Sequence, residues 1–292
     1  MQSRWGLVLL ALTIVATQVG WSQESDKPLP DIPMLMLEVE SQQRASEAIE
    51  RDYLYHAVET EQEIDSHGAV KKTEVVEHDV FWLNGVEVER LTSKDGRPLT
   101  DKEKHKEDER IDKEAAKAAE RRAKADAEGK ETDPHGEDEV TVSRLLELGR
   151  FTNAHRVQLD GRDTIVVDYA GDPAAKTRTR FETVIRDLVG TIWVDEQDHA
   201  IVRLEGRFVN NFKIAGGLMV NIQKGLTFSL AQSRVNGEIW LPARAEGKGS
   251  ARVMLFFNFN GRLTAEYSGY RKFKASSTIV PEGEKKVEEA PQ

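Results

Sequence analysis

Histidines are the first candidates for metal binding or proton transfer in this sequence. The seven histidines stand at positions 56, 67, 78, 105, 135, 155 and 199. No two of them have the i, i+4 spacing that puts two imidazoles on one face of a helix. Glu77, His78 and Asp79 are adjacent, but they fall in a segment typical of a strand, where neighbouring side chains point to opposite faces. We therefore predict no metal site and interpret this triplet as a solvated strand face.

Carboxylates and glycines are the other candidates for catalytic chemistry. Asp168, Asp195 and Glu205 lie in or beside predicted strands and could form a glycosidase-like pair, although surface charge and turn capping are the commoner uses. No G-x-S-x-G or H-E-x-x-H motif occurs. Gly216-Gly217 has neither the lysine nor the strand-to-helix context of a phosphate-binding loop. The sequence predicts no catalytic residue and no cofactor, and hence no enzyme.

Apolar side chains give a stronger indication of function than polar ones. The run LTFSL (226–230) and the run VMLFFNF (253–259), taken as one strand, each place alternate apolar side chains on one face of a sheet. Together with two tryptophans, these side chains form the predicted lining of a hydrophobic ligand cavity: Leu226, Phe228, Leu230, Val253, Leu255, Phe257, Phe259, Trp193 and Trp240. The alternative is that helices predicted at 37–50 and 179–188 fill the hollow completely.

The elements that must position this lining are mostly strands joined by tight turns. A loose helical spacing of apolar residues predicts a helix from about Met34 to Arg51. Three strands follow at 52–65, 70–83 and 86–93. The turns after them, His67-Gly68, Asn84-Gly85 and Asp95-Gly96, favour positive φ at the glycine, so we predict a three-stranded meander.

A highly charged helix follows the meander. Thr100 and Glu103 form a capping box at its start, and Ile111 with several alanines is its only apolar stripe, so we predict a mostly solvated helix to about 128. Short helices are predicted within EVTVSRLLELGRF and over 179–188, where Phe181, Val184, Ile185 and Leu188 form a stripe. Strands fill the rest of the chain as far as Lys274, with hairpin turns at Asp160-Gly161 and Asn236-Gly237. KIAGGLMVNIQKG (213–225) is predicted to be a pliable apolar loop or a plain hairpin connection.

These elements predict a mainly β (α+β) fold. Its curved antiparallel sheet of about ten or eleven strands forms an unclosed half-barrel, with helices covering the concave face and one long charged helical insertion. The predicted limits are a signal peptide at 1–22, a single half-barrel domain at 34–275 and a disordered acidic tail at 276–292. Within the domain, 34–98 holds the first helix and the meander, 99–137 the charged insertion and its loop, and 138–275 the C-terminal sheet with two helices.

Composition and the first residues predict an exported protein. Arg4 precedes an apolar run from Trp5 to about Val19, which is shorter than the roughly 20 residues that span a bilayer, so we predict cleavage after Ser22 rather than an uncleaved anchor. The sequence has no cysteine, which excludes disulfides, thiolate metal sites and a lipid attached after the apolar run. A net charge of −10 without a basic stripe argues against nucleic acid as a partner. The predicted location is the Gram-negative periplasm, with no stable membrane span after cleavage.

Two tryptophan motifs carry a resemblance to a known family. GTIWVDEQDHAIVRLEG contains Trp193, Asp195 and the Arg203-Leu204-Glu205 triplet, and NGEIWLPARAEG contains Trp240-Leu241-Pro242. This pattern, followed by a strand ending in AEYSGYRKF, resembles the LolA-like superfamily of outer-membrane lipoprotein sorting and carrier proteins. The resemblance covers 190–274 well and the meander in outline. It implies an open antiparallel barrel with helices in its hollow, which holds acyl chains or lipidated peptides.

Two functions are consistent with these observations, and a third, an enzyme acting on envelope polymers, would need carboxylates that converge in a cleft. The first is an exported soluble protein that binds a lipid or lipidated peptide in a half-barrel cavity, with a role in envelope lipid or lipoprotein trafficking. The alternative is a periplasmic sensor or scaffold that binds an envelope protein partner through its sheet and helical arm, without catalysis. A helix of about 25 residues would reach roughly 40 Å, enough to touch such a partner, but it could equally be an insertion without a function.

Overall fold

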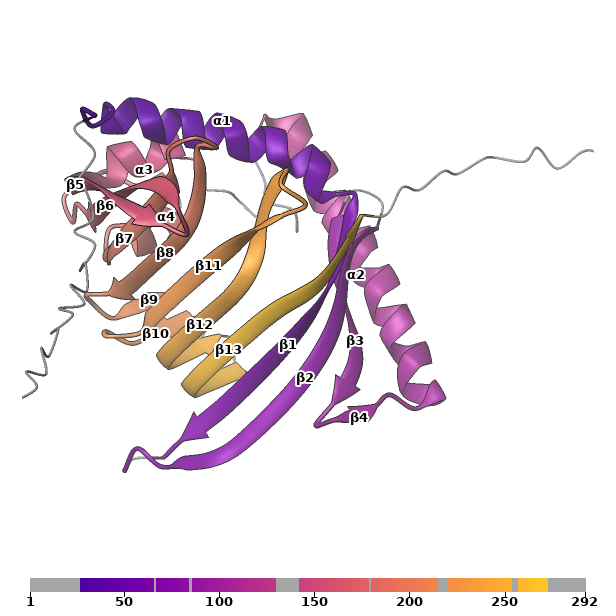
Figure 1. Ribbon diagram of the computed structural model, residues 1–292. Helices are drawn as coiled ribbons and strands as arrows, with labels where there is room; N and C mark the ends of the chain where they lie inside the picture. The colour runs from indigo at the N-terminus through magenta and orange to yellow at the C-terminus, as the bar shows by residue number, and fades with distance from the viewer. Residues whose placement is uncertain are drawn as a thin grey trace, which may run out of the picture.

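The structure is a computed structural model, and it describes residues 27–65, 67–83, 86–129, 142–178, 180–214, 220–253 and 257–272. In this part of the chain, four helices accompany one large antiparallel sheet that is not closed into a barrel (Figure 1). The helices are α1 (Ile32–Glu50), α2 (Asp101–Glu128), α3 (Val142–Leu148) and α4 (Arg180–Ile185). The predicted fold class is confirmed. The predicted domain limits stay predictions, and the signal peptide and tail lie outside the described residues.

The sheet has thirteen described strands. They are β1 (Tyr53–Ile64), β2 (Val70–Leu83), β3 (Val86–Lys94), β4 (Arg97–Pro98), β5 (Gly149–Leu159), β6 (Arg162–Gly171), β7 (Leu188–Asp195), β8 (Ala200–Phe208), β9 (Phe212–Ile214), β10 (Val220–Ile222), β11 (Thr227–Val235), β12 (Ile239–Val253) and β13 (Phe257–Lys272). Their order is β4-β3-β2-β1-β13-β12-β11-β8-β7-β6-β5, and the β9–β10 hairpin attaches to β12. The pairing of β1 with β13 joins the N-terminal meander to the rest of the sheet.

Tight turns between strands have the backbone that the sequence predicts. Asp95-Gly96, Asp160-Gly161 and Asn236-Gly237 all have positive φ at both residues, from 50° at Asp95 to 77° at Gly161. Two consecutive positive φ values define the turn that matches the twist of a two-residue hairpin, and Asp-Gly and Asn-Gly are the pairs that adopt it most readily. Asn84-Gly85 lies outside the described residues.

Helices α1, α3 and α4 pack on one face of the sheet, which we call the α1 face. Asp31 caps α1 by accepting a hydrogen bond from the Met34 N–H at 3.0 Å. Leu35, Met36 and Val39 of α1 are buried against Ile165 of β6 and Val194 of β7. On the same face, α3 and α4 bury Leu148 and Ile185 against Tyr169 of β6. In Figure 1, α1 runs across the ends of the strands.

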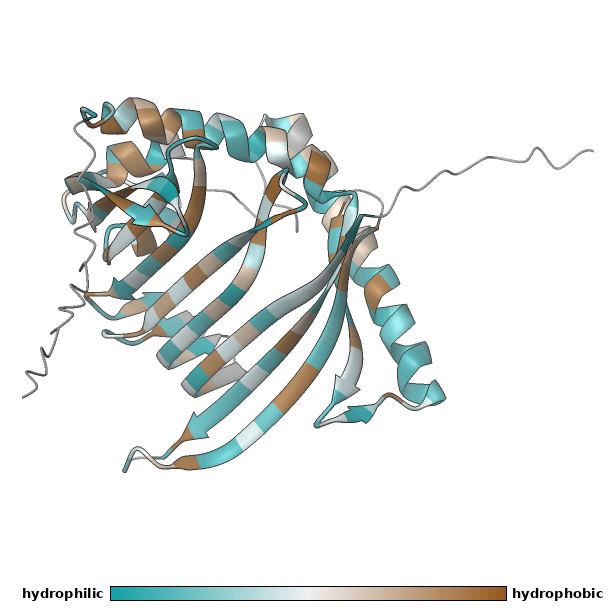
Figure 2. Cartoon of the chain, in the orientation of Figure 1, coloured by the Kyte–Doolittle hydropathy of each residue, from teal (hydrophilic) through white to brown (hydrophobic). Residues whose placement is uncertain are grey.

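Helix α2 packs on the opposite face, along the edge of the meander. Ile111, Ala115 and Ala118 are buried against Val86 and Val88 of β3, so the predicted apolar stripe is confirmed. The rest of the helix is hydrophilic (Figure 2). The predicted capping box is also present, since the Thr100 N–H donates to Glu103 at 2.8 Å and the Glu103 N–H donates to the Thr100 hydroxyl at 3.4 Å.

Polar side chains of α2 form hydrogen bonds with backbone groups of the edge strand β3. Glu107 accepts a hydrogen bond from the Leu91 N–H at 2.8 Å, and Arg110 donates one to the Glu89 carbonyl at 2.6 Å. These bonds replace those that a further strand would make, because β4 pairs only with Ser93 and Lys94. Covering an edge in this way prevents unwanted strand pairing. The charged helix therefore has a structural role along the sheet, and it does not project from the sheet as a free arm over this length.

Two sequence-based predictions of elements are wrong. Residues 253–259 are not one strand, because β12 ends at Val253, β13 begins at Phe257, and these two residues pair with each other. The alternation of apolar residues runs through this hairpin without a glycine or proline to mark it. The helix predicted over 179–188 ends at Ile185, and Leu188 instead opens β7 opposite Phe208. None of the helices in the described ranges is long and apolar enough to cross a membrane.

Candidate ligand-binding site

Helix α1 is anchored to the sheet at its two ends by apolar side chains. Its first turns bury Leu35, Met36 and Val39 on β6 and β7. Near its other end, Ile49 packs on a cluster made by Tyr53, Ile239 and Leu241. Between these anchors, the residues of α1 that look toward the sheet are Gln42, Gln43 and Ser46. Between Val39 and Ile49 the only apolar side chains of α1 are the small, exposed Ala45 and Ala48, so its middle spans β8, β11 and β12 without a large apolar side chain.

A cleft of about 550 Å³ lies in this middle region, and we call it the α1 cleft. Its floor on the sheet is mainly apolar, with Leu204 of β8, Leu230 of β11 and Trp240 of β12. Further wall residues are Val39, Glu50, Gln197, Asp198, His199, Ala200, Ile201, Gln232, Arg234, Glu238, Ile239 and Pro242. An apolar floor beneath a polar stretch of helix leaves the floor without a matching surface in the protein.

One ionisable group in the α1 cleft titrates far from its ordinary range. Burial, with the negative charges of Glu87 and Glu47, raises the pKa of Glu50 from 4.5 to about 7, against a smaller opposite effect of Arg51. Desolvation disfavours the ionised carboxylate, and nearby carboxylates disfavour it further. Because the pKa is raised in the folded protein, Glu50 costs no stability below pH 4.5 and costs its full amount above pH 7.

We expect Glu50→Gln to raise the free energy of unfolding by about 2 kcal/mol at pH 8 and to leave it nearly unchanged at pH 4.5. The glutamine keeps the size of the side chain but removes the buried charge. Urea unfolding followed by circular dichroism at the two pH values measures the difference. Glu120→Gln, at an exposed position of α2, is the control and should change stability little at either pH. An equal gain from Glu50→Gln at both pH values would contradict this origin of the effect.

The predicted lining residues divide among several places. Leu230 and Trp240 line the α1 cleft. Leu226 and Phe228 pack instead into a cluster with Phe208, and the Phe228 ring lies over Gly206. That cluster, which also contains Val184 of α4 and Phe212, fills its part of the α1 face. At this place the alternative prediction, a hollow filled by a helix, describes the packing better than a cavity does.

The other predicted residues lie away from the α1 cleft. Phe259 of β13 is buried, with 8% of its surface exposed. Val253 and Phe257 are placed only by their backbone pairing at the β12–β13 hairpin, and Leu255 lies outside the described residues. Trp193 points to the face opposite α1, because it alternates with Ile192 and Val194, and its ring lies 5.1 Å from the Arg203 guanidinium. No single cavity among the described residues contains all nine.

The two tryptophan motifs meet in a polar network beside the α1 cleft. Asp195 is 1% exposed and accepts hydrogen bonds from Arg162 at 2.7 Å and from the Asp198 N–H at 2.7 Å. Asp198 in turn forms an ion pair with Arg234 at 2.8 Å and accepts a hydrogen bond from the Trp240 indole N–H at 2.9 Å. The network ties the β7–β8 turn to β6, β11 and β12, and it fixes Trp240 at the edge of the cleft. Asp195 is thus held in place by Arg162 and by the backbone of its own turn.

The side chains of Glu77, His78 and Asp79 point to alternate faces of the sheet, as predicted for a strand. Glu77 and Asp79 lie on the same side and contact His56 of β1 at 3.3 Å and 3.2 Å. His78 points to the other face, 3.9 Å from Glu59. Sequence reasoning placed the acids correctly but missed His56 as their partner. In the described ranges, no group of three or more acidic or histidine side chains is arranged to hold a metal ion.

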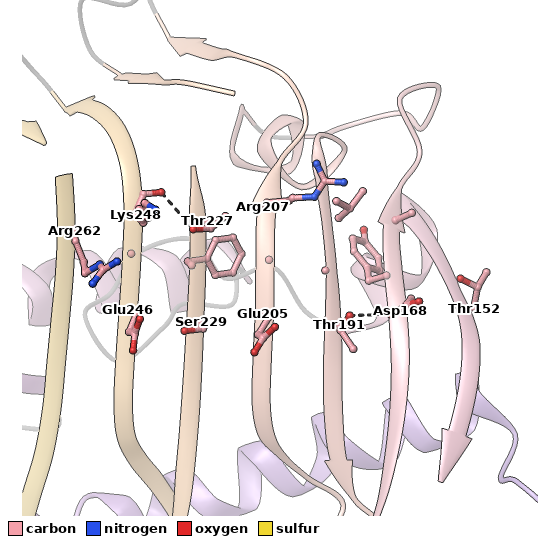
Figure 3. Close-up of a pocket in the computed structure, with 17 residues that line it drawn as sticks. Thr152, Asp168, Thr191, Glu205, Arg207, Thr227, Ser229, Glu246, Lys248 and Arg262 are labelled. Carbon is pink, nitrogen blue, oxygen red and sulfur yellow. Dashed lines mark hydrogen bonds between the residues drawn. The ribbon is translucent and has the colours of Figure 1, made fainter. Parts of the chain in front are cut away.

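A second hollow, of about 680 Å³, lies on the sheet face opposite α1, and we call it the cross-strand groove (Figure 3). Two rows of side chains form its walls. The first row is Thr152, Asp168, Thr191, Glu205, Ser229 and Glu246, and the second includes Arg207, Thr227, Lys248 and Arg262. Sequence reasoning missed the groove, although RLEGR (203–207) and RAEGK (244–248) repeat one pattern of charge in the two strands that flank β11.

No family model matches this sequence, and no curated protein matches it. The fold is similar to several solved structures. One is a putative outer membrane lipoprotein-sorting protein domain from Vibrio parahaemolyticus, with 11% identity over 82% of this chain and 92% of that one, at a TM-score of 0.38. A LolA superfamily protein from Nitrosomonas europaea has 10% identity over 81% and 93%, at a TM-score of 0.33.

A third similar structure is the MucA/MucB complex of Pseudomonas aeruginosa, with 10% identity over 82% of this chain and 100% of that one, at a TM-score of 0.21. The first two carry the description of the superfamily that the tryptophan motifs resemble. Identities and TM-scores at this level transfer no function to this chain.

Proposed function

We propose that this protein binds a hydrophobic ligand, a lipid or a lipidated peptide, in the α1 cleft, without catalysis. One observation carries the proposal: α1 is anchored at both ends but places Gln42, Gln43 and Ser46 in the cleft above Leu204, Leu230 and Trp240. An acyl chain would supply the apolar surface that the helix lacks. Each methylene buried there contributes about 0.8 kcal/mol.

The size of the α1 cleft and the apolar side chains on its floor support this ligand class. Its volume of about 550 Å³ falls within the roughly 300–1,000 Å³ of typical small-ligand sites. The apolar floor suits a hydrocarbon chain, while Gln42, Gln43 and Ser46 can form hydrogen bonds to a polar group at the rim. We place the protein in the periplasm on the basis of its predicted signal peptide, where a carrier of this kind would serve envelope lipid or lipoprotein trafficking.

We expect Ser46→Leu to weaken binding of a fluorescent acyl probe at least fivefold while raising the melting temperature. The leucine would extend from α1 over Leu204 and Leu230, filling the space that the acyl chain needs and adding apolar contact to the protein itself. The readouts are titration with the probe, thermal unfolding, and native mass spectrometry of lipids that co-purify with the protein.

Ser41→Leu is the matched control, because Ser41 is exposed on the same helix and does not line the cleft. It should leave probe binding unchanged. A wild-type protein that purifies without lipid and ignores the probe would overturn the proposal. In that case the alternative, a sensor or scaffold that binds a protein partner through its sheet, would be the better interpretation.

A further inference from the structure

The cross-strand groove runs perpendicular to the strands, between two parallel rows of side chains (Figure 3). Strand register produces both rows. Glu205, Ser229 and Glu246 are direct neighbours on β8, β11 and β12, and Arg207, Thr227 and Lys248 are neighbours one repeat further along. Arg262 of β13 continues the second row beside Lys248. Since alternate residues rise about 6.6 Å along a strand, the two walls stand about that far apart.

The carboxylate wall is already neutralised by the protein. Arg203 donates to Glu205 at 2.9 Å, and Arg244 donates to Glu246 at 2.6 Å, both from the side away from the groove. Asp168 accepts hydrogen bonds from Asn153 and Thr191, which hold its pKa below the ordinary value. The carboxylate oxygens of this wall can accept hydrogen bonds, and Thr191 and Ser229 between them add hydroxyl groups.

The cationic wall has no such compensation. Within the described residues, none of Arg207, Lys248 and Arg262 has a side-chain hydrogen bond or an ion pair. Three cations in one row across β8, β12 and β13 thus face the groove without counter-charges. This arrangement is complementary to an elongated ligand that carries anionic groups along one side.

We propose that the cross-strand groove binds an anionic glycan chain, one built of sugars that carry carboxylate groups. Its carboxylates would pair with Arg207, Lys248 and Arg262, while sugar hydroxyls donate hydrogen bonds to Glu205, Glu246 and the hydroxyl side chains of the opposite wall. The site lies on the face opposite the α1 cleft, so this binding goes beyond the proposed function and does not depend on it.

Other anionic partners fit the groove less well. An acidic peptide could not add as a strand, because β7, β8, β11 and β12 are paired on both sides, and its carboxylate side chains offer no hydrogen-bond donors to Glu205 and Glu246. An anionic membrane surface would meet a protein with a net charge of −10, and it would bring negative charge against the carboxylates of the opposite wall as well as against the cations. A glycan offers hydroxyl donors and anions together, which matches both walls.

The test is isothermal titration of the full chain with tetragalacturonate, an oligomer of four uronic acid residues. We expect binding that weakens as salt rises from 50 to 300 mM. The triple variant Arg207→Gln/Lys248→Gln/Arg262→Gln should weaken it at least tenfold, and Glu205→Gln/Glu246→Gln about threefold. The control Lys104→Gln/Lys113→Gln/Lys124→Gln removes the same charge from exposed positions of α2 and should leave binding unchanged.

Comparison ligands decide between this proposal and its competitors. Equal binding of neutral maltotetraose, or of tetraglutamate, would overturn it, as would binding to phosphatidylglycerol vesicles without binding to the oligomer. An unaltered affinity in the triple groove variant would also overturn it. Each variant's circular dichroism and acyl-probe binding show whether it is folded, and they separate failure of this proposal from failure of the α1 cleft as a lipid site. If the triple variant does not fold, the double variant Glu205→Gln/Glu246→Gln tests the proposal instead, and an unaltered affinity of that variant would overturn it.

Discussion

Asp195→Ala is expected to lower the free energy of unfolding by about 3 kcal/mol at pH 7. Asp195 is 1% exposed and accepts hydrogen bonds from Arg162 and from the N–H groups of Gln197 and Asp198. Its removal leaves the Arg162 cation half-compensated and both N–H groups without their acceptor. The β7–β8 turn, which holds Trp240 through Asp198, should loosen as well. Urea unfolding followed by circular dichroism measures the loss.

Glu205→Ala is the matched control, because Glu205 also pairs with an arginine but is 42% exposed, and its partner Arg203 is 49% exposed. Its effect should stay within about 1 kcal/mol, as for other surface ion pairs. Although burial opposes ionisation, Arg162 and the two N–H groups keep the pKa of Asp195 below its ordinary value. The difference between wild type and Asp195→Ala should therefore be complete at neutral pH and shrink as the pH falls through that lowered pKa. Equal losses of unfolding free energy in the two variants would show that the buried Asp195 pair stabilises the protein no more than an exposed ion pair does.

Local sequence determines the elements where a short segment contains the whole cause. Asp160-Gly161 and Asn236-Gly237 form hairpin turns because these residue types tolerate positive φ better than others. Thr100 and Glu103 form a capping box because they stand three residues apart at the start of a helix. Each of these predictions needs only neighbours along the chain, and each is confirmed.

The two hollows have causes that lie far apart in the sequence. The α1 cleft exists because the apolar anchors of α1 contact β6 at one end and β12 at the other, so that Gln42 and Gln43 come to lie over Leu204 and Leu230. The sequence shows the apolar strands but not where a helix crosses them. Phe228 shows the same limit, since its face was predicted correctly but Phe208 and α4 fill the space beside it.

The cross-strand groove depends on register between strands that are not consecutive. Arg207 and Arg262 lie on strands separated by β11 and β12, and a shift of one residue in any pairing would move a cation to the α1 face. The shared pattern of RLEGR and RAEGK is visible in the sequence, but its meaning appears only once β11 is known to lie between them. The β12–β13 hairpin was missed for the opposite reason: nothing in 253–259 distinguishes a turn from a continuing strand.

Gly261→Ala is expected to lower the free energy of unfolding by about 3 kcal/mol, at the upper end for one added methyl group. A Cβ at Gly261 would lie 1.7 Å from the Gln62 carbonyl oxygen of β1. That oxygen belongs to backbone and cannot turn aside as a side chain could, so β1 and β13 must separate locally. Among the described strands, the β1–β13 pairing is the one that connects β1–β4 to the rest of the sheet. We therefore expect the meander to unfold in a separate, earlier transition, seen as a biphasic urea curve.

Gly247→Ala tests whether the effect comes from this contact or from glycine itself. Gly247 lies on β12, and the nearest atom that its Cβ would meet is the Leu263 Cβ at 4.0 Å, an ordinary contact distance. Alanine there should be neutral or slightly stabilising, because it reduces the conformational freedom of the unfolded chain. A single unfolding transition for Gly261→Ala, with a midpoint equal to that of Gly247→Ala, would mean that β1 and β13 accommodate the methyl group. The close contact between Gly261 and the Gln62 carbonyl would then not determine the stability of the β1–β13 pairing.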